Sequence, residues 1–176
     1  MEFDGWQART TLCLGLVLLI SLVSTVDCQY RNLNDVPSSF PPDTQVLLLN
    51  NNNILNITDN IDYLAIYHED IAANKRLQFI NAGWNQISYI SRLSFKTMSK
   101  LKHLLLSTNN LLYIPQAVYG LRKLANLDLK ENDIRSLPMT VFQGLVSLQT
   151  LDISENPNIG TLPYGLFAGL FNLQTI

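Results

Sequence analysis

The feature that most constrains this chain is a pattern of apolar residues and asparagine that returns along most of its length. Apolar residues stand at the fourth, sixth and eleventh positions of each copy and asparagine at the ninth, with one residue inserted at Pro157 in the last copy. The copies are Thr44–Ile54, Leu77–Ile87, Leu101–Leu111, Leu124–Ile134 and Leu148–Ile159. From Leu77 onward the starts lie 24, 23, 24 and 25 residues apart. Such a period predicts stacked units that share one core.

Alternation inside each copy assigns a role to each position. Residues two apart on a strand point to the same side, so Leu127 and Leu129 are expected to face inward while Asp128 faces outward. The ninth-position asparagines are expected to bond backbone groups where the chain leaves the strand, because buried backbone polar groups need partners. This structural asparagine ladder comprises Asn52, Asn85, Asn109, Asn132 and Asn156.

The second half of each unit also repeats, as Leu137, Pro138, Phe142 and Leu145 show in the fourth copy. With these motifs, residues 28–176 resemble the extracellular "typical" leucine-rich repeat family, which includes Toll-like receptor ectodomains, Slit and small leucine-rich proteoglycans. The resemblance implies an α/β fold. It would be a leucine-rich repeat solenoid, or horseshoe, with a parallel β-sheet on the concave face, five full repeats and a truncated sixth that begins at Leu173.

Aromatic residues recur in the second half of the units as well. Phe95, Tyr119, Phe142 and Phe167 hold matching positions, and we interpret them as a packed aromatic spine on the convex side.

The amino-terminal residues differ from the repeats. Residues 1–27 carry the run LCLGLVLLISLV, which is too short to span a membrane and is typical of a signal-peptide core. We expect cleavage near residues 25–28 and a secreted or extracellular protein. Residues 28–43 resemble a degenerate amino-terminal cap, and residues 44–176 hold the repeats. Because the sixth unit stops at Ile176, we expect a fragment of a longer protein or an end that another chain covers.

The stretch LDLKENDI places Asp128, Glu131 and Asp133 around Lys130, which invites a metal or catalytic hypothesis. The repeat register argues against it, since these are the variable positions of one copy. Neither His68 nor His103 has the spacing of a metal site, and no common catalytic or phosphate-binding motif is present. We therefore expect no enzyme, no cofactor and no metal, and we expect neither a nucleic-acid partner nor a membrane span in this chain.

The resemblance implies a recognition module that binds an extracellular protein ligand on its concave face. Asn50 also holds an outward position there, beside Gly83 in the next copy. Aromatic anchors and charged groups on this face are the candidate contacts. The predicted ligand-binding residues are Phe79, Trp84, His103, Leu105, Asp128, Lys130, Glu131, Asp152 and Glu155.

An alternative function rests on charge. Residues 71–127 hold eight basic residues and no acidic one, and pairs of bases precede three successive strands. These pairs predict a basic edge that holds sulfated glycans, as in a matrix component. Its residues are Lys75, Arg76, Lys100, Lys102, Arg122 and Lys123. The sequon Asn56-Ile57-Thr58 makes Asn56 the predicted glycosylation site.

Overall fold

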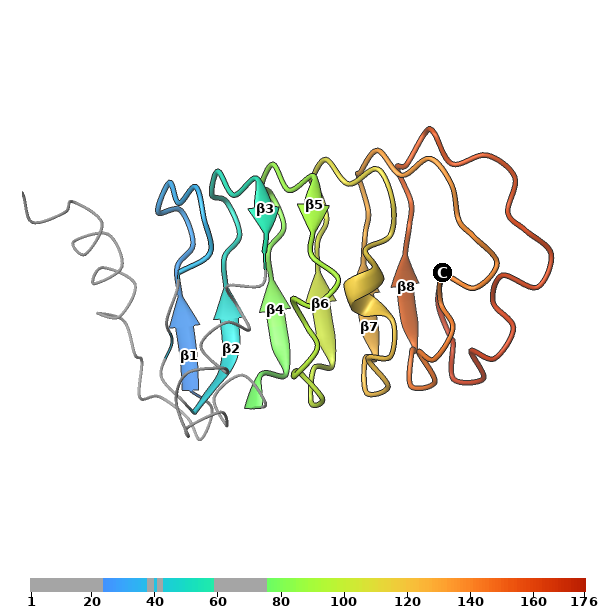
Figure 1. Cartoon of the computed structure of the whole chain (residues 1–176), viewed down its shortest axis with the longest axis horizontal. Helices are drawn as coiled ribbons and strands as arrows, with labels where there is room; N and C mark the ends of the chain where they lie inside the picture. The colour runs from blue at the N-terminus through green and yellow to red at the C-terminus, as the bar shows by residue number, and fades with distance from the viewer. Residues whose placement is uncertain (1–23, 38–39, 41–42, 59–75) are drawn as a thin grey trace, which may run out of the picture.

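The computed structural model describes residues 24–37, 40, 43–58 and 76–176. Parallel strands form a main sheet in the order β1-β2-β4-β6-β7-β8 and a smaller sheet of β3 and β5. The main-sheet strands are β1 (Ser24–Asp27), β2 (Thr44–Leu48), β4 (Phe79–Asn81), β6 (His103–Leu105), β7 (Asn126–Asp128) and β8 (Thr150–Asp152). The other elements are β3 (Asn56–Ile57), β5 (Tyr89–Ile90) and the 3-10 helix η2 (Gln116–Val118). The described residues thus form a solenoid with one strand of the main sheet per coil (Figure 1).

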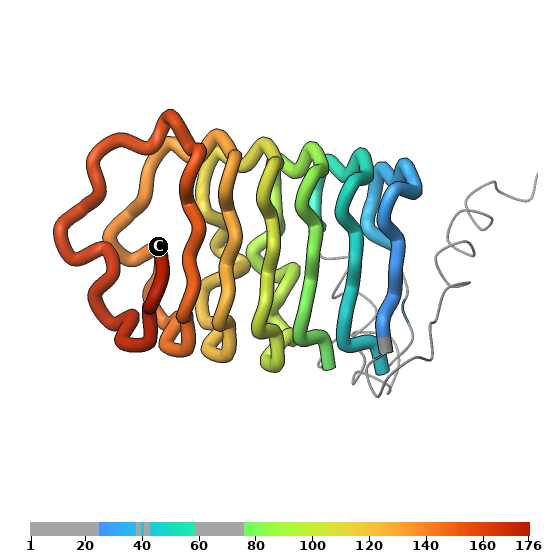
Figure 2. The backbone as a smooth tube through the Cα atoms, turned by 180° about the vertical axis from the view of Figure 1, so that it is seen from behind, coloured from blue at the N-terminus to red at the C-terminus, as the bar shows by residue number. Residues whose placement is uncertain are grey.

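The leucine pattern builds the sheet as the sequence predicts. In β4, β6, β7 and β8 the central residue is buried and its two neighbours are half-buried, which is the alternation of a strand with one face inward. Equivalent residues pair across strands, so Leu104 lies beside Leu127, and Leu127 beside Leu151. The main sheet lies on the side of the coils that faces the viewer in Figure 2. β3, β5 and η2 lie on the other side, which faces the viewer in Figure 1. We name these sides the sheet face, which is the predicted concave face, and the opposite face.

Each ninth-position asparagine is buried and joins two coils. The Asn109 Nδ2 group donates to the carbonyl oxygen of Ala82 at 3.0 Å and to that of Leu106 at 3.1 Å. Its Oδ1 accepts from the Ile87 backbone N–H at 2.9 Å. Equivalent bonds recur in the neighbouring coils, where Asn85 and Asn132 hold the same place. The ladder therefore satisfies buried backbone groups in its own coil and in the coil before it.

The predicted aromatic spine is wrong at one of its four positions. Phe95 and Phe142 are buried, and Phe142 stacks on the partly buried Phe167 with ring centroids 6.0 Å apart. Tyr119 instead is 42% exposed, and Val118 fills the core in its place. The third repeat is one residue shorter than its neighbours. Val118 therefore lies six residues before the next repeat start, as the phenylalanines do, and Tyr119 turns outward.

The main sheet includes residues that precede the predicted cap. β1 pairs in parallel with β2, and its Val26 is buried in the core next to the buried Cys28. Asn52 continues the asparagine ladder into this segment, since its Oδ1 accepts from the backbone N–H groups of Arg31 and Leu33. Residues 24–27, which composition assigns to a signal peptide, thus form the first strand of the sheet.

The sixth unit enters the sheet at the other end. Thr175 forms a parallel bridge to Thr150, and the Leu151 N–H donates to the Thr175 carbonyl oxygen at 3.1 Å. Leu173 is packed against the core, as the first position of a repeat should be.

Candidate functional site

Strand register arranges the outward side chains of the sheet face in rows. Phe79 lies between Val46 and His103, and its ring is tilted against the imidazole with centroids 5.7 Å apart. In the next row the half-buried Leu105 lies between Asn81 and Asp128. Two predicted contacts, Phe79 and His103, therefore come together, and Leu105 lies two residues along the same strand.

A third row follows the strands and has an unusual backbone. The residue before each ladder asparagine has a positive φ between 50° and 59°, a left-handed conformation that favours glycine. These residues are Asn51, Trp84, Thr108, Glu131 and Glu155. The conformation turns each backbone N–H to the next coil, as the Trp84 N–H donates to the Ser107 carbonyl oxygen at 3.0 Å. Trp84 is 53% exposed in this row.

The two aspartates of the sheet face accept hydrogen bonds from nearby backbone N–H groups. Asp128 lies directly beside Asp152 in the register. Oδ1 of Asp128 accepts from the Lys130 N–H at 3.0 Å, and Oδ1 of Asp152 accepts from the Ser154 N–H at 2.9 Å. These are the turns by which an aspartate ends a strand. Asp128 and Asp152 therefore shape the turn and also present negative charge on the sheet face.

Glutamates of the third row have partners in neighbouring coils. Glu155 pairs with Lys130 at 2.9 Å, and Glu131 accepts from the Thr108 hydroxyl at 2.9 Å. The hydrogen bond and charge of Glu155 raise the pKa of the Lys130 ammonium. The cluster therefore contains one basic and four acidic side chains.

This acidic group does not form a metal centre. Among the described residues no three His, Cys, Asp or Glu side chains converge on a point where a metal ion would bind. The carboxylates are instead spread over two coils and two rows.

Asn50 departs from its predicted outward position. It is 6% exposed, and its Nδ2 group donates to Oε1 of Gln29 at 3.0 Å. Its Oδ1 is the buried side-chain acceptor without a partner in the described part of the chain. Gln29, its partner, follows β1, and Ser107, at the equivalent position of the third repeat, is buried to the same extent.

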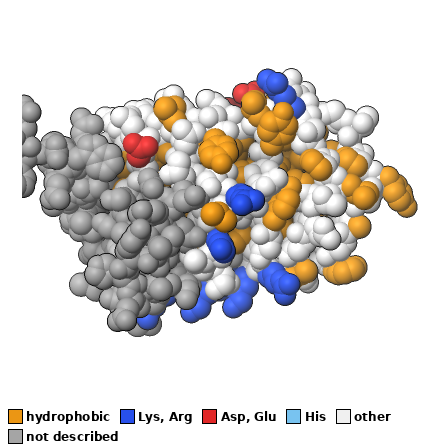
Figure 3. Space-filling model, in the orientation of Figure 1, with side chains coloured by type: hydrophobic (Ala, Val, Ile, Leu, Met, Phe, Trp, Pro, Cys, Tyr) orange, Lys and Arg blue, Asp and Glu red, His pale blue; other side chains and the backbone are white. Residues whose placement is uncertain are grey.

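The predicted basic edge lies where the strands begin. Arg76, Lys100, Lys102 and Lys123 are exposed, and Lys and Arg side chains follow the lower edge in Figure 3. Backbone bonds place the coils side by side there, since Lys102 N–H donates to the Gln78 carbonyl oxygen and Ala125 N–H to that of Lys102. Arg122 is exposed as well, and Lys75 lies outside the described residues.

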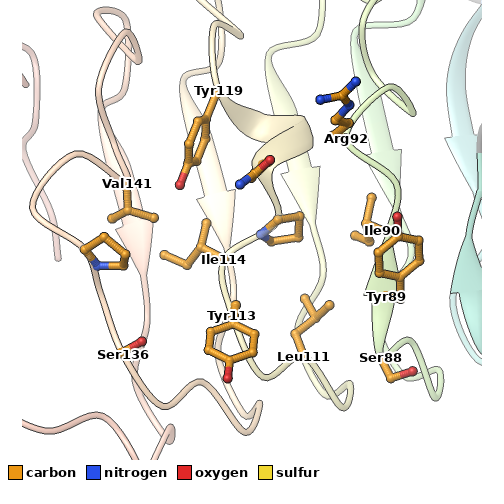
Figure 4. A pocket seen from close by; sticks show the side chains of 13 residues that line it. Ser88, Tyr89, Ile90, Arg92, Leu111, Tyr113, Ile114, Tyr119, Ser136 and Val141 are labelled. Carbon is orange, nitrogen blue, oxygen red and sulfur yellow. The ribbon is translucent and has the colours of Figure 1, made fainter.

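A groove on the opposite face was missed by the sequence analysis. It has a volume of about 430 Å³, and its walls include Tyr89, Tyr113 and Tyr119. Figure 4 shows these three tyrosines around the groove, with Arg92 near its edge. Tyr89 and Tyr113 both lie two residues after the buried apolar residue that follows the ladder asparagine. An alignment of the second halves of the units contains this signal.

Leucine and asparagine ladders repeat in the coils of this parallel-stranded solenoid, whereas the exposed residues of its strands vary from coil to coil. Solenoids of this kind form a class of recognition scaffolds. The sequence profile of the family described as "Leucine rich repeat" matches residues 75–134 and 122–176. The chain belongs to the leucine-rich repeat family.

Its similar relatives include Toll-like receptors and Tsukushi-A. Mouse Toll-like receptor 9 is 28% identical over 144 residues, which cover 81% of this chain and 12% of the receptor. Toll-like receptor 4 of Boselaphus tragocamelus is 29% identical and covers 99% of the chain and 22% of the receptor. Tsukushi-A of Xenopus laevis is 31% identical, covering 73% of the chain and 34% of the relative. The chain thus spans only a small part of the length of these relatives. In the described residues no helix is long and apolar enough to cross a bilayer.

Proposed function

We propose that this chain is a non-enzymatic extracellular recognition module that binds a protein ligand through its sheet face. The observation that carries the proposal is the division of this face into an apolar half and an acidic half. Toll-like receptor 9 and Toll-like receptor 4 are receptors by name, and a recognition role for this chain agrees with that similarity.

The apolar half supplies burial. The tilted rings of Phe79 and His103 lie close together, Leu105 is half-buried, and Trp84 has more than half of its surface exposed. Large aromatic side chains near the centre of an interface carry much of its binding energy.

The acidic half supplies orientation. Lys130 pairs with Glu155, and the charges of Asp152 and Glu131 also act on its ammonium, so acidic side chains outnumber the basic one and a basic patch on the ligand is the complementary surface. Charges of this kind steer association, whereas the aromatic half slows dissociation.

A second candidate is binding of sulfated glycans to the basic edge. The observation that favours it is the exposure of Arg76, Lys100, Lys102 and Lys123 on successive coils at one edge. Stacked strands are about 4.8 Å apart, so these cations form a line along the solenoid axis. Such binding falls steeply as salt is raised.

Substitution of Trp84 by alanine tests the first candidate. We expect a loss of about 2 kcal/mol or more in binding, mostly as faster dissociation, since an exposed anchor is removed. Surface plasmon resonance against the purified extracellular partner measures both rates. Tyr113→Ala is the matched control, because Tyr113 is 60% exposed and lies on the opposite face.

Equal binding by wild type, Trp84→Ala and Tyr113→Ala would contradict the sheet-face proposal. If neutralisation of Lys100, Lys102 and Lys123 then abolished binding, and raised salt did the same, the basic edge would replace it.

The secretory route is also a proposal, supported by the apolar run before Val23. Because β1 starts at Ser24 and buries Val26, we expect the mature chain to retain Ser24. Amino-terminal sequencing of protein released by a secretory host measures this. A first residue between 25 and 27 would mean that processing shortens β1, and a first residue of 28 or 29 that it removes β1. A chain that still starts at Met1 would contradict secretion through this segment.

A further inference from the structure

The groove on the opposite face exposes an unusual set of aromatic rings. Tyr89 is 57% exposed and Tyr113 60% exposed, and they project from neighbouring coils into the same region (Figure 4). Tyr119 joins them because the short third repeat turns it outward. Exposed apolar groups that gather in one place indicate a surface that is covered by something.

Register identifies what lies at the other end of this row. β3 pairs in parallel with β5, and Asn56 is the direct partner of Tyr89. Asn56 lies two residues after the buried Ile54, as Tyr89 lies after Ile87 and Tyr113 after Leu111. The Asn56 side chain therefore emerges about 4.8 Å from the strand of Tyr89, on the same side.

Asn56 is also presented in a form suited to modification. Asn56 and Thr58 are both exposed while Ile57 between them is fully buried, so the asparagine and hydroxyl of the sequon project outward together. Ser94 fixes the backbone from below, because its hydroxyl donates to the carbonyl oxygens of Ile57 at 3.1 Å and Thr58 at 3.2 Å. The acceptor thus has a defined direction relative to Tyr89.

We propose that Asn56 carries an N-linked glycan whose first sugars lie along the groove, over Tyr89 and toward Tyr113. The C–H face of an N-acetylglucosamine ring is apolar and flat, so it buries the exposed face of a tyrosine ring. Its acetamide and hydroxyl groups find hydrogen-bonding partners in the Tyr119 hydroxyl, the Gln116 amide and the Arg92 guanidinium that border the groove.

The glycan has a consequence for the whole solenoid. A sugar chain is bulky and well hydrated, so it closes the opposite face to other partners and leaves the sheet face free. The inference goes beyond the proposed function and does not require the proposed ligand, and its failure would leave the sheet-face proposal intact.

Nitration of tyrosine by tetranitromethane tests the contact from the protein side. The full chain is secreted by a host that attaches N-linked glycans, as wild type, as Asn56→Gln and as Thr58→Ala, which removes the sequon but keeps Asn56. We expect Tyr89 to react about threefold more slowly in wild type than in either variant, because the sugar covers its free face. Tyr164, which is fully exposed, is the internal control and should react equally in all three.

Release of the glycan tests the contact from the sugar side. We expect an amidase to remove the glycan from native Tyr89→Ser about threefold faster than from wild type, since the ring no longer holds the first sugars. Tyr164→Ser should match wild type. A wild-type chain without a mass shift after amidase treatment would overturn the proposal. If the chain is glycosylated but the variants change neither the nitration rate of Tyr89 nor the rate of glycan release, the proposed position of the glycan over Tyr89 is wrong.

Discussion

Replacement of Asn109 by alanine is expected to lower the free energy of unfolding by about 3 kcal/mol, since several buried hydrogen bonds are lost together. The Ile87 N–H and the Ala82 carbonyl oxygen both lose a bond to this side chain, and neither is open to water. Urea unfolding followed by circular dichroism measures the loss, with an unchanged slope against denaturant as the sign that only stability has changed.

Asn110→Ala is the matched control for this experiment. Asn110 is the adjacent residue of the same type, but it is exposed, and its backbone N–H bonds to the Ile87 carbonyl oxygen whatever its side chain. We expect a change within about 0.5 kcal/mol. Similar losses for the two variants would mean that the ladder does not carry the stability assigned to it.

Spacing alone located the asparagine ladder and the leucine core. A side chain at the ninth position of every copy is forced into the same surroundings each time, so one physical argument covers Asn85, Asn109 and Asn132 together. Repetition also fixed the direction of the strands, because equivalent leucines can pair only when neighbouring strands run parallel.

Truncation of Phe142 to alanine is expected to cost about 4 kcal/mol, because a fully buried ring leaves a cavity that the coils cannot close. Phe142 is 1% exposed and stacks on Phe167, so two coils lose packing at once. Thermal unfolding by calorimetry measures the loss.

Tyr119→Ala is the control, and its expected cost is below about 1 kcal/mol because the ring stands outside the core. A loss as large as that of Phe142→Ala would restore Tyr119 to the spine and contradict the register described for the third repeat.

The incorrect prediction that Tyr119 is buried shows the limit of counting positions along a repeat. Positions after the asparagine can be counted from the unit's own start or from the next one, and a unit that is one residue short makes the two counts disagree. The core follows the next start, so Val118 and not Tyr119 is buried. β1 escaped prediction for a different reason, since Ser24–Asp27 adjoins an apolar run whose composition is that of a signal peptide.

The candidate site was predicted in outline but not in detail. Alternation placed Phe79, Leu105 and Asp128 on one face, as the register shows. It could not reveal that Asp128 also holds a turn, because that bond depends on the backbone path after the strand. The tyrosine groove was hidden because its residues come from three separate repeats and meet only when the coils stack.

The side-chain bonds of the asparagine ladder all point the same way along the chain. Beyond its own coil, the Asn109 side chain bonds to Ala82 and Ile87 before it, and the Asn132 side chain to Leu106 and Leu111. In the described residues, no ladder side chain bonds to a coil that follows it in the sequence. During synthesis, each coil can therefore close its asparagine bonds as soon as it leaves the ribosome, on a surface that earlier coils have already completed. The polarity of the ladder thus matches the order of translation, and a new repeat appended after an existing one disturbs none of the bonds made before it.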